Sequence, residues 1–156
     1  MKRARLFLLV TIVLVALGGI EVWQAFAAND RVSFPEGYAD GVHFATVNRG
    51  NVREEIFAPP AAIEAAKNGH PLPDGTVITM EDYRGGTLYR YVVMEKRAGW
   101  GTAYPAETRN GDWEYREFRP DRTPNRGEDG TRCMSCHISQ AGKDFVFTYD
   151  RMRAAR

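Results

Sequence analysis

Two cysteines and a histidine form one compact motif, CMSCH at residues 133–137, near the end of a 156-residue chain. The C-x-x-C-H spacing is typical of the attachment site of a c-type haem. Two thiols three residues apart lie on one turn, where each can add across a haem vinyl group to form a thioether. The histidine that follows can give an imidazole nitrogen to the iron. The motif therefore predicts one covalent haem c, attached through Cys133 and Cys136, with His137 as the metal ligand.

Three other roles for the cysteines stay open at this level. A zinc site would need two further ligands, and the other two histidines, His43 and His70, lie far upstream and outside any second paired motif. A thioredoxin-like redox centre would need a βαβ context before the motif, whereas residues 123–132 (TPNRGEDGTR) are loop-like. A structural disulfide would leave His137 without a role. These are the only two cysteines, so haem attachment would use them completely.

The N-terminal segment is typical of an export signal. Residues 1–5 (MKRAR) carry three positive charges, residues 6–20 are an apolar run without charge, and Ala25-Phe26-Ala27 is a small-x-small cleavage site. We therefore predict a signal peptide over residues 1–27. A periplasmic location agrees with the motif, because haem c is attached outside the bacterial inner membrane.

The same segment can also be interpreted as a retained anchor. Val22-Trp23 could lengthen the apolar run and place an aromatic ring at the membrane interface, although Glu21 disfavours deep insertion. Membrane anchoring would then use residues 6–23. In either case the basic N-terminus stays inside, and the haem domain, residues 28–156, lies outside.

Composition limits the function classes. About 129 residues follow the export segment, which is enough for one domain. The chain has 21 Lys+Arg and 20 Asp+Glu, and its formal net charge is +1. This balance gives no electrostatic basis for nucleic-acid binding.

The segments that must position the motif are predicted mainly as strands. Residues 87–96 (TLYRYVVMEK) are the clearest case, because they are rich in β-branched and aromatic residues. Pro59-Pro60 ends an earlier strand and begins a short helix, and residues 82–86 are predicted as a turn. The predicted strands are residues 41–47, 51–58, 76–81, 87–96 and 112–118, and the predicted helices are residues 61–67 and 150–155.

The pattern of residues 112–118 (DWEYREF) does not decide which side chains of this strand face the core. Trp113 and Tyr115 alternate as expected, but the next alternate position is the charged Glu117. The fold class is nonetheless predicted as mainly β (α+β), with short helices and the haem attached near the C-terminus. Ordinary small cytochromes c are helical and carry the motif near their N-terminus, so this chain belongs to a different class.

The order of several short segments resembles the cytochrome P-460 family, which includes the β-sheet cytochromes c′-beta. The matching segments are residues 34–38 (FPEGY), 60–69, 72–77 (LPDGTV), Trp113-x-Tyr115, 133–137 (CMSCH) and 144–148 (DFVFT). The resemblance implies a homodimer with a mainly antiparallel sheet and one haem c. Its iron would be five-coordinate and His-ligated, with a distal face open to small nitrogen compounds.

One position departs from the active members of that family. Members with a lysine–haem cross-link oxidise hydroxylamine, and c′-like members without it bind nitric oxide. The resemblance places the cross-linking position at Met80, whose thioether cannot form the nitrogen–carbon bond. The nearest lysines, Lys67 and Lys96, do not match. Met80 would instead pack at the haem edge, reach the iron as a sixth ligand or form an unusual link through sulfur.

The resemblance also implies an acid in the distal pocket, a few residues before the first haem cysteine. Glu128 lies at about that place and is the candidate catalytic residue, because a carboxylate there could accept a proton from a bound ligand. The alternative is a solvated acid in the polar loop 125–132. His43 and His70 match no ligand of the family.

These observations predict a periplasmic mono-haem c cytochrome that binds a small gaseous or nitrogenous ligand such as nitric oxide. Two alternatives stay open. One is a His/Met electron-transfer cytochrome that serves a redox partner protein, and the other is a hydroxylamine-oxidising enzyme of the P-460 type.

Overall fold

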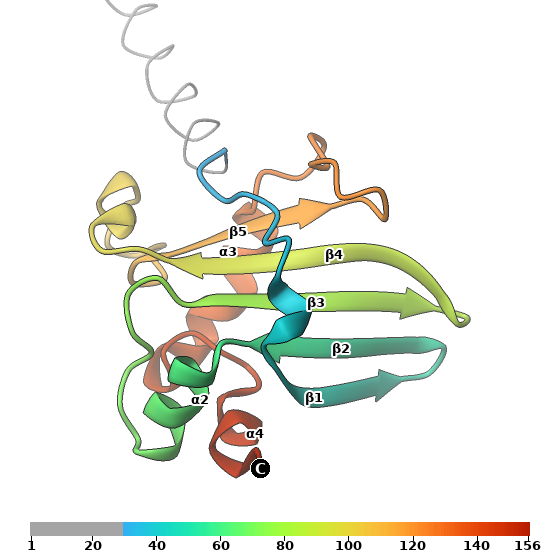
Figure 1. Ribbon diagram of the computed structural model, residues 1–156. Helices are drawn as coiled ribbons and strands as arrows, with labels where there is room; N and C mark the ends of the chain where they lie inside the picture. The colour runs from blue at the N-terminus through green and yellow to red at the C-terminus, as the bar shows by residue number, and fades with distance from the viewer. Residues whose placement is uncertain (1–29) are drawn as a thin grey trace, which may run out of the picture.

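The computed structural model describes residues 30–156, so the predicted signal or anchor lies outside the described residues. Five antiparallel strands form one sheet in the order β1-β2-β3-β4-β5, and each strand pairs with the next along the chain (Figure 1). This confirms the predicted fold class. The strands are β1 Val42–Arg49, β2 Val52–Ala58, β3 Val77–Arg84, β4 Thr87–Lys96 and β5 Trp113–Phe118.

The helices are short and lie before, between and after the strands. The three α-helices are α2 Pro60–Lys67, α3 Thr131–His137 and α4 Tyr149–Ala154. The three 3₁₀ helices are η1 Tyr38–Asp40, η2 Trp100–Ala103 and η3 Ile138–Lys143. Proline begins α2, where its missing N–H costs nothing. Among residues 30–156, no helix is both long enough and apolar enough to cross a membrane.

The turn predicted at residues 82–86 is wrong over most of its length. Strand β3 continues to Arg84, and only Gly85 and Gly86 turn the chain, with φ of 57° and 84°. Two consecutive residues with positive φ make the tight hairpin turn that matches the twist of the strands. Asp82 therefore lies within the sheet, directly opposite Arg90 of β4.

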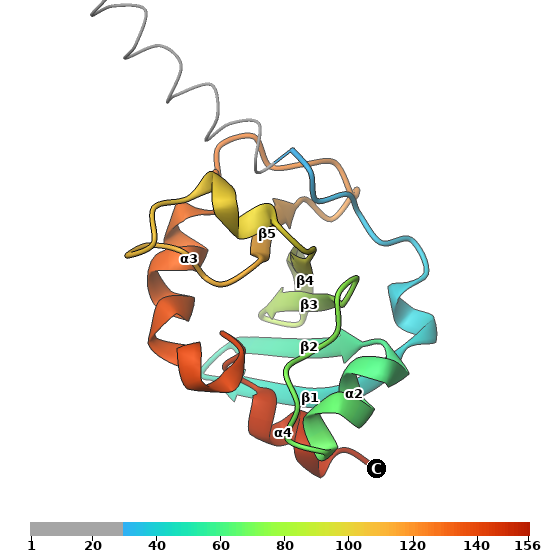
Figure 2. The same ribbon diagram turned by 90° about the vertical axis from the view of Figure 1, so that its left-hand side faces the viewer.

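The three α-helices cover one face of the sheet, and residues 30–41, which include η1, cover the other (Figure 2). All three α-helices contribute to one apolar core with the sheet, through residues such as Ala62, Met134 and Met152. A second, smaller apolar core on the other face joins Val32, in the chain before β1, to Val93 and Phe118. Side chains on the helix-covered face are the ones that can meet the C-x-x-C-H motif.

The register of β5 is settled by this packing. Trp113 and Tyr115 are almost fully buried on the helix-covered face, and Glu117 follows on the same face because strand side chains alternate. In the register of the sheet, Glu117 lies opposite Val92, and Val92 lies opposite Met80. These three side chains form a half-buried row across the middle of the helix-covered face.

Candidate haem attachment site

Helix α3 carries the whole C-x-x-C-H motif. Gly130 precedes it with φ of 81°, and the helix begins where the Met134 N–H donates to the Gly130 carbonyl at 3.0 Å. Met134 is buried in the core and so fixes how the helix lies on the sheet. Cys133 is half-buried, Cys136 is exposed, and both thiols are free. The two thiols are thus one helical turn apart, as thioether attachment to a single haem requires.

The imidazole of His137 is held in one tautomer. Its Nδ1 lies 2.7 Å from the carbonyl oxygen of Phe145. A carbonyl can only accept a hydrogen bond, so Nδ1 must carry the proton and Nε2 must carry the lone pair. The rings of Tyr115 and Phe147 contact the imidazole, with centroids at 4.8 and 4.9 Å. This is the arrangement of an iron-binding histidine, whose second nitrogen is oriented by a hydrogen bond.

Burial shifts the pKa values of two groups in the motif, the His137 imidazole and the Cys133 thiol. It lowers the pKa of His137, partly opposed by the Phe145 hydrogen bond, and so favours the neutral imidazole that can bind a metal. Burial also raises the pKa of the Cys133 thiol. A redox C-x-x-C motif needs the opposite, a thiol with lowered pKa. The raised pKa of the Cys133 thiol thus disfavours a thioredoxin-like centre.

Met80 lies on the same face of the sheet as the motif. It is half-buried and, like Cys133, packs against the main apolar core. Its neighbours across the strands are Ile56 and Val92. Met80 and Val92 are half-buried apolar side chains on this face, of the kind that line a haem ring. The residues present thus fit a haem held by Cys133, Cys136 and His137.

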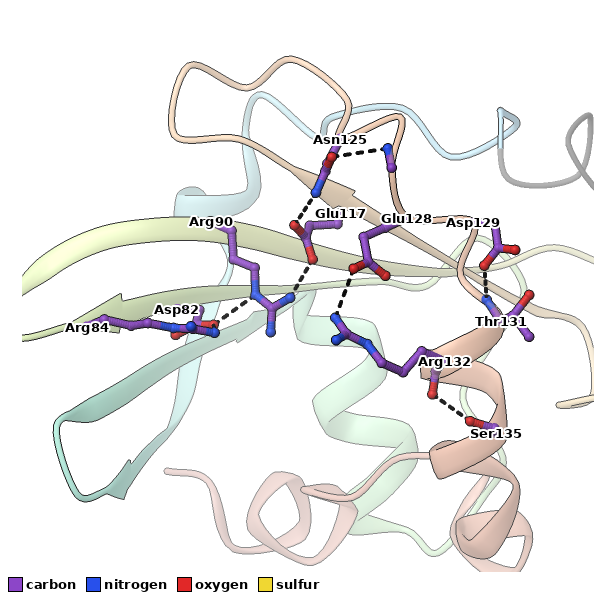
Figure 3. A network of polar contacts seen from close by, with 11 residues as sticks. Asp82, Arg84, Arg90, Glu117, Asn125, Glu128, Asp129, Thr131, Arg132 and Ser135 are labelled. Carbon is purple, nitrogen blue, oxygen red and sulfur yellow. Dashed lines mark hydrogen bonds and ion pairs between the residues drawn. The ribbon is translucent and has the colours of Figure 1, made fainter.

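Glu128 lies beside this face in the loop before α3. Its Oε1 is 3.3 Å from Nη2 of Arg132, in the first turn of α3, and the Glu128 side chain is 33% exposed (Figure 3). The carboxylate is therefore held next to the attachment helix by a charged side chain of that helix. The charges of Glu128 and Arg132 both act on the Cys133 thiol.

A second charged group reaches the same place from the sheet, and sequence analysis did not identify it. Arg90 Nε donates to Asp82 at 2.8 Å, and its Nη1 donates to Glu117, which also accepts from Asn125 at 2.6 Å (Figure 3). Asp82 is 2% exposed. The sequence contains a sign of this group, because Arg90 and Glu117 alternate with residues of the opposite face along β4 and β5 and so share the face of the apolar core residues. Their partner Asp82 could not be recognised, because residue 82 was predicted to lie in a turn.

The structure does not bring the other histidines to the motif. His43 lies on β1, where its Nε2 is 2.7 Å from Glu55 and its ring contacts Phe57. The carbonyl of His70 accepts a hydrogen bond from the Tyr149 hydroxyl. Within residues 30–156, no group of three or more His, Cys, Asp or Glu side chains is placed to hold a metal ion.

The comparisons with known proteins point to the same family as the motif. No curated protein shows a significant match to the chain. The model of the Cytochrome P460 family, a family of haem c cytochromes, matches residues 35–148. This match spans the whole sheet and the C-x-x-C-H motif. The chain therefore belongs to the cytochrome P460 family.

Proposed function

We propose that the protein is a periplasmic cytochrome that binds a small ligand such as nitric oxide at a His137-ligated haem c. The observation that carries this proposal is the hydrogen bond from Nδ1 of His137 to the Phe145 carbonyl at 2.7 Å. It leaves Nε2 as the ligand atom. When bound to these residues, haem c would supply a redox-active iron that can take up the small ligand.

Met80 decides between ligand binding and hydroxylamine oxidation in this proposal. A methionine there cannot form the nitrogen–carbon link of the oxidising relatives. The nearest lysines have other partners. Lys96 Nζ donates to Asp144 at 2.8 Å and to the Leu72 carbonyl at 2.9 Å, and Lys67 pairs with Glu64 on the same helix at 3.0 Å. We therefore assign Met80 to packing at the haem edge.

Charged groups give the proposed haem site a polar edge. Arg90 is held by two carboxylates on the sheet side, and Glu128 is held by Arg132 on the helix side. We propose that Glu128 is the pocket acid, because its carboxylate can accept a proton from a protonated ligand or orient a bound water. Arg90 would favour a ligand that gains negative charge when it binds.

Export and assembly belong to the same proposal. Haem c attachment outside the inner membrane and the export segment support a periplasmic location. The family resemblance supports a homodimer, and a redox partner protein would reduce the iron before the ligand binds.

Absorption spectra of the purified exported protein, with and without nitric oxide, test the function. We expect a high-spin, five-coordinate ferrous spectrum that shifts when nitric oxide is added. The variant Met80→Ala should leave the spin state unchanged. A low-spin wild type that becomes high-spin in Met80→Ala would contradict the proposal, because it would make Met80 the sixth ligand of an electron carrier.

A further inference from the structure

Two consecutive residues just after η3 have an unusual backbone conformation. Asp144 and Phe145 have φ of 50° and 61°, and neither is glycine. Positive φ is rare outside glycine, costs free energy, and persists only where surrounding contacts hold it. Phe145 is also the residue whose carbonyl accepts the hydrogen bond from His137. The conformation at this point therefore sets where the acceptor of the metal-binding histidine lies.

The carboxylate of Asp144 anchors this segment to three other parts of the chain. Its Oδ2 accepts from the Leu72 N–H at 2.8 Å and from Lys96 Nζ at 2.8 Å. Its Oδ1 accepts from the same Nζ at 3.0 Å, and Trp113 Nε1 lies 3.4 Å away. The Asp144 side chain is only 14% exposed. A single carboxylate thus joins the loop after α2, the end of β4 and the start of β5.

The backbone hydrogen bonds around Phe145 are local. The Phe145 N–H donates to the Gln140 carbonyl of η3 at 2.9 Å, and the N–H of the next residue, Val146, donates to the Lys143 carbonyl at 3.0 Å. The Phe145 ring contacts Gly111, where an added Cβ would lie 3.1 Å from Phe145 Cε2. The Asp144 carboxylate therefore supplies the long-range polar contacts that fix this segment, and with it the Phe145 carbonyl, relative to the sheet.

We propose that Asp144 is a positioning residue for the haem: it holds the Phe145 carbonyl against His137 Nδ1–H and so keeps the axial imidazole strongly basic. A hydrogen bond donated from Nδ1 increases electron density at Nε2. A more basic imidazole binds iron more strongly and stabilises the ferric state, which lowers the reduction potential. This inference rests on the proposed haem ligation by His137.

The first test is Asp144→Asn in the exported holoprotein. Asparagine adopts positive φ as readily as aspartate, so the backbone preference is kept. The neutral amide loses the ion pair with Lys96 and points N–H groups where donors already lie. We expect the Fe–His stretching band of the ferrous protein, measured by resonance Raman, to shift to lower frequency. The reduction potential should rise, with haem content unchanged.

The matched control is Asp150→Asn, six residues along the chain. Asp150 pairs with Lys143 at 2.6 Å, but both side chains are well exposed. The same charge is lost, but Asp150 takes part in none of the hydrogen bonds of the Asp144 carboxylate. The Fe–His band should remain as in the wild type.

The second test is Lys96→Met, which separates positioning from the simple effect of charge. Loss of a positive charge alone would lower the reduction potential. Loss of the anchor weakens the hydrogen bond to His137 and should raise the potential, with the Fe–His band again at lower frequency. This variant also tests the proposal if Asp144→Asn fails to fold.

Three outcomes would contradict the inference or the proposed function on which it rests. If the variants are less stable but keep the wild-type Fe–His band, Asp144 is only structural and the inference is overturned. The inference is also overturned if the potential rises in Asp144→Asn and falls in Lys96→Met while the band stays constant. A wild type that lacks covalent haem or a Fe–His band would instead refute the proposed function.

Discussion

Glu114 of β5 is a buried carboxyl group whose environment disfavours its charge. It is 1% exposed, and burial raises its pKa from 4.5 to about 7, partly opposed by Arg31, whose Nη1 lies 3.0 Å from Oε1. Within residues 30–156, Oε2 has no hydrogen-bond partner. Glu95 lies directly opposite on β4 and adds a like charge. The perturbation to test is Glu114→Gln.

The direction in which stability changes with pH follows from the raised pKa of Glu114. Below pH 4.5 the carboxyl is protonated in both the folded and the unfolded chain, so folding buries no charge at this position. Between pH 4.5 and about 7 the unfolded chain loses this proton before the folded chain does, so stability falls as pH rises. Each pKa unit corresponds to about 1.4 kcal/mol, so the full loss is about 3 kcal/mol above pH 7. Glutamine has nearly the same shape and does not titrate.

Urea unfolding of both proteins between pH 4 and 8, measured by circular dichroism, checks this prediction. The free energy of unfolding of Glu114→Gln should equal that of the wild type near pH 4. Near pH 8 the free energy of unfolding of Glu114→Gln should exceed that of the wild type by about 3 kcal/mol. Glu64→Gln, at an exposed glutamate of α2, should show no such pH-dependent difference. A Glu114→Gln difference that stays constant with pH would refute the reasoning.

Three further predictions concern the haem surroundings and export. Gly111→Ala should lower the free energy of unfolding by about 1–3 kcal/mol in urea titrations, because φ is 57° and the new Cβ would press on Phe145. Met80→Lys treated with peroxide or hydroxylamine should develop the red-shifted absorption band of the cross-linked relatives. An ordinary spectrum would count against placing residue 80 beside the ring. Mass spectrometry of the exported protein should find an N-terminus at Ala28, whereas an intact N-terminus in the membrane fraction would establish the anchor.

The sheet was largely predictable because its strands have strong local signals. Residues 87–96 were predicted with the bounds that the structure has, since a run of β-branched and aromatic residues has few other stable conformations. Strand β3 was cut short at residue 81 because Asp82 and Arg84 are polar. Asp82 pairs with Arg90 across the hairpin and with Arg84 of its own strand. The pairing with Arg90 is visible only once the register is known.

The candidate site was likewise predictable only where the sequence signal is local. The spacing of C-x-x-C-H predicts which residues attach the haem, because the chemistry of a single haem demands that spacing. The acceptor for His137 was not predictable, since it is a backbone carbonyl eight residues away in a segment with positive φ at two residues other than glycine. Asp144 was part of a matching segment, but its contacts to Leu72 and Lys96 are long-range.

Covalent haem at the C-x-x-C-H motif is the central claim, and intact-mass measurement of the denatured protein tests it most directly. The protein should be made with a c-type cytochrome maturation system and compared with Cys133→Ala/Cys136→Ala. We predict that the wild-type mass exceeds that of the polypeptide by one haem and that the double variant has the mass of the polypeptide alone. A wild-type chain that loses all haem on denaturation would contradict the account.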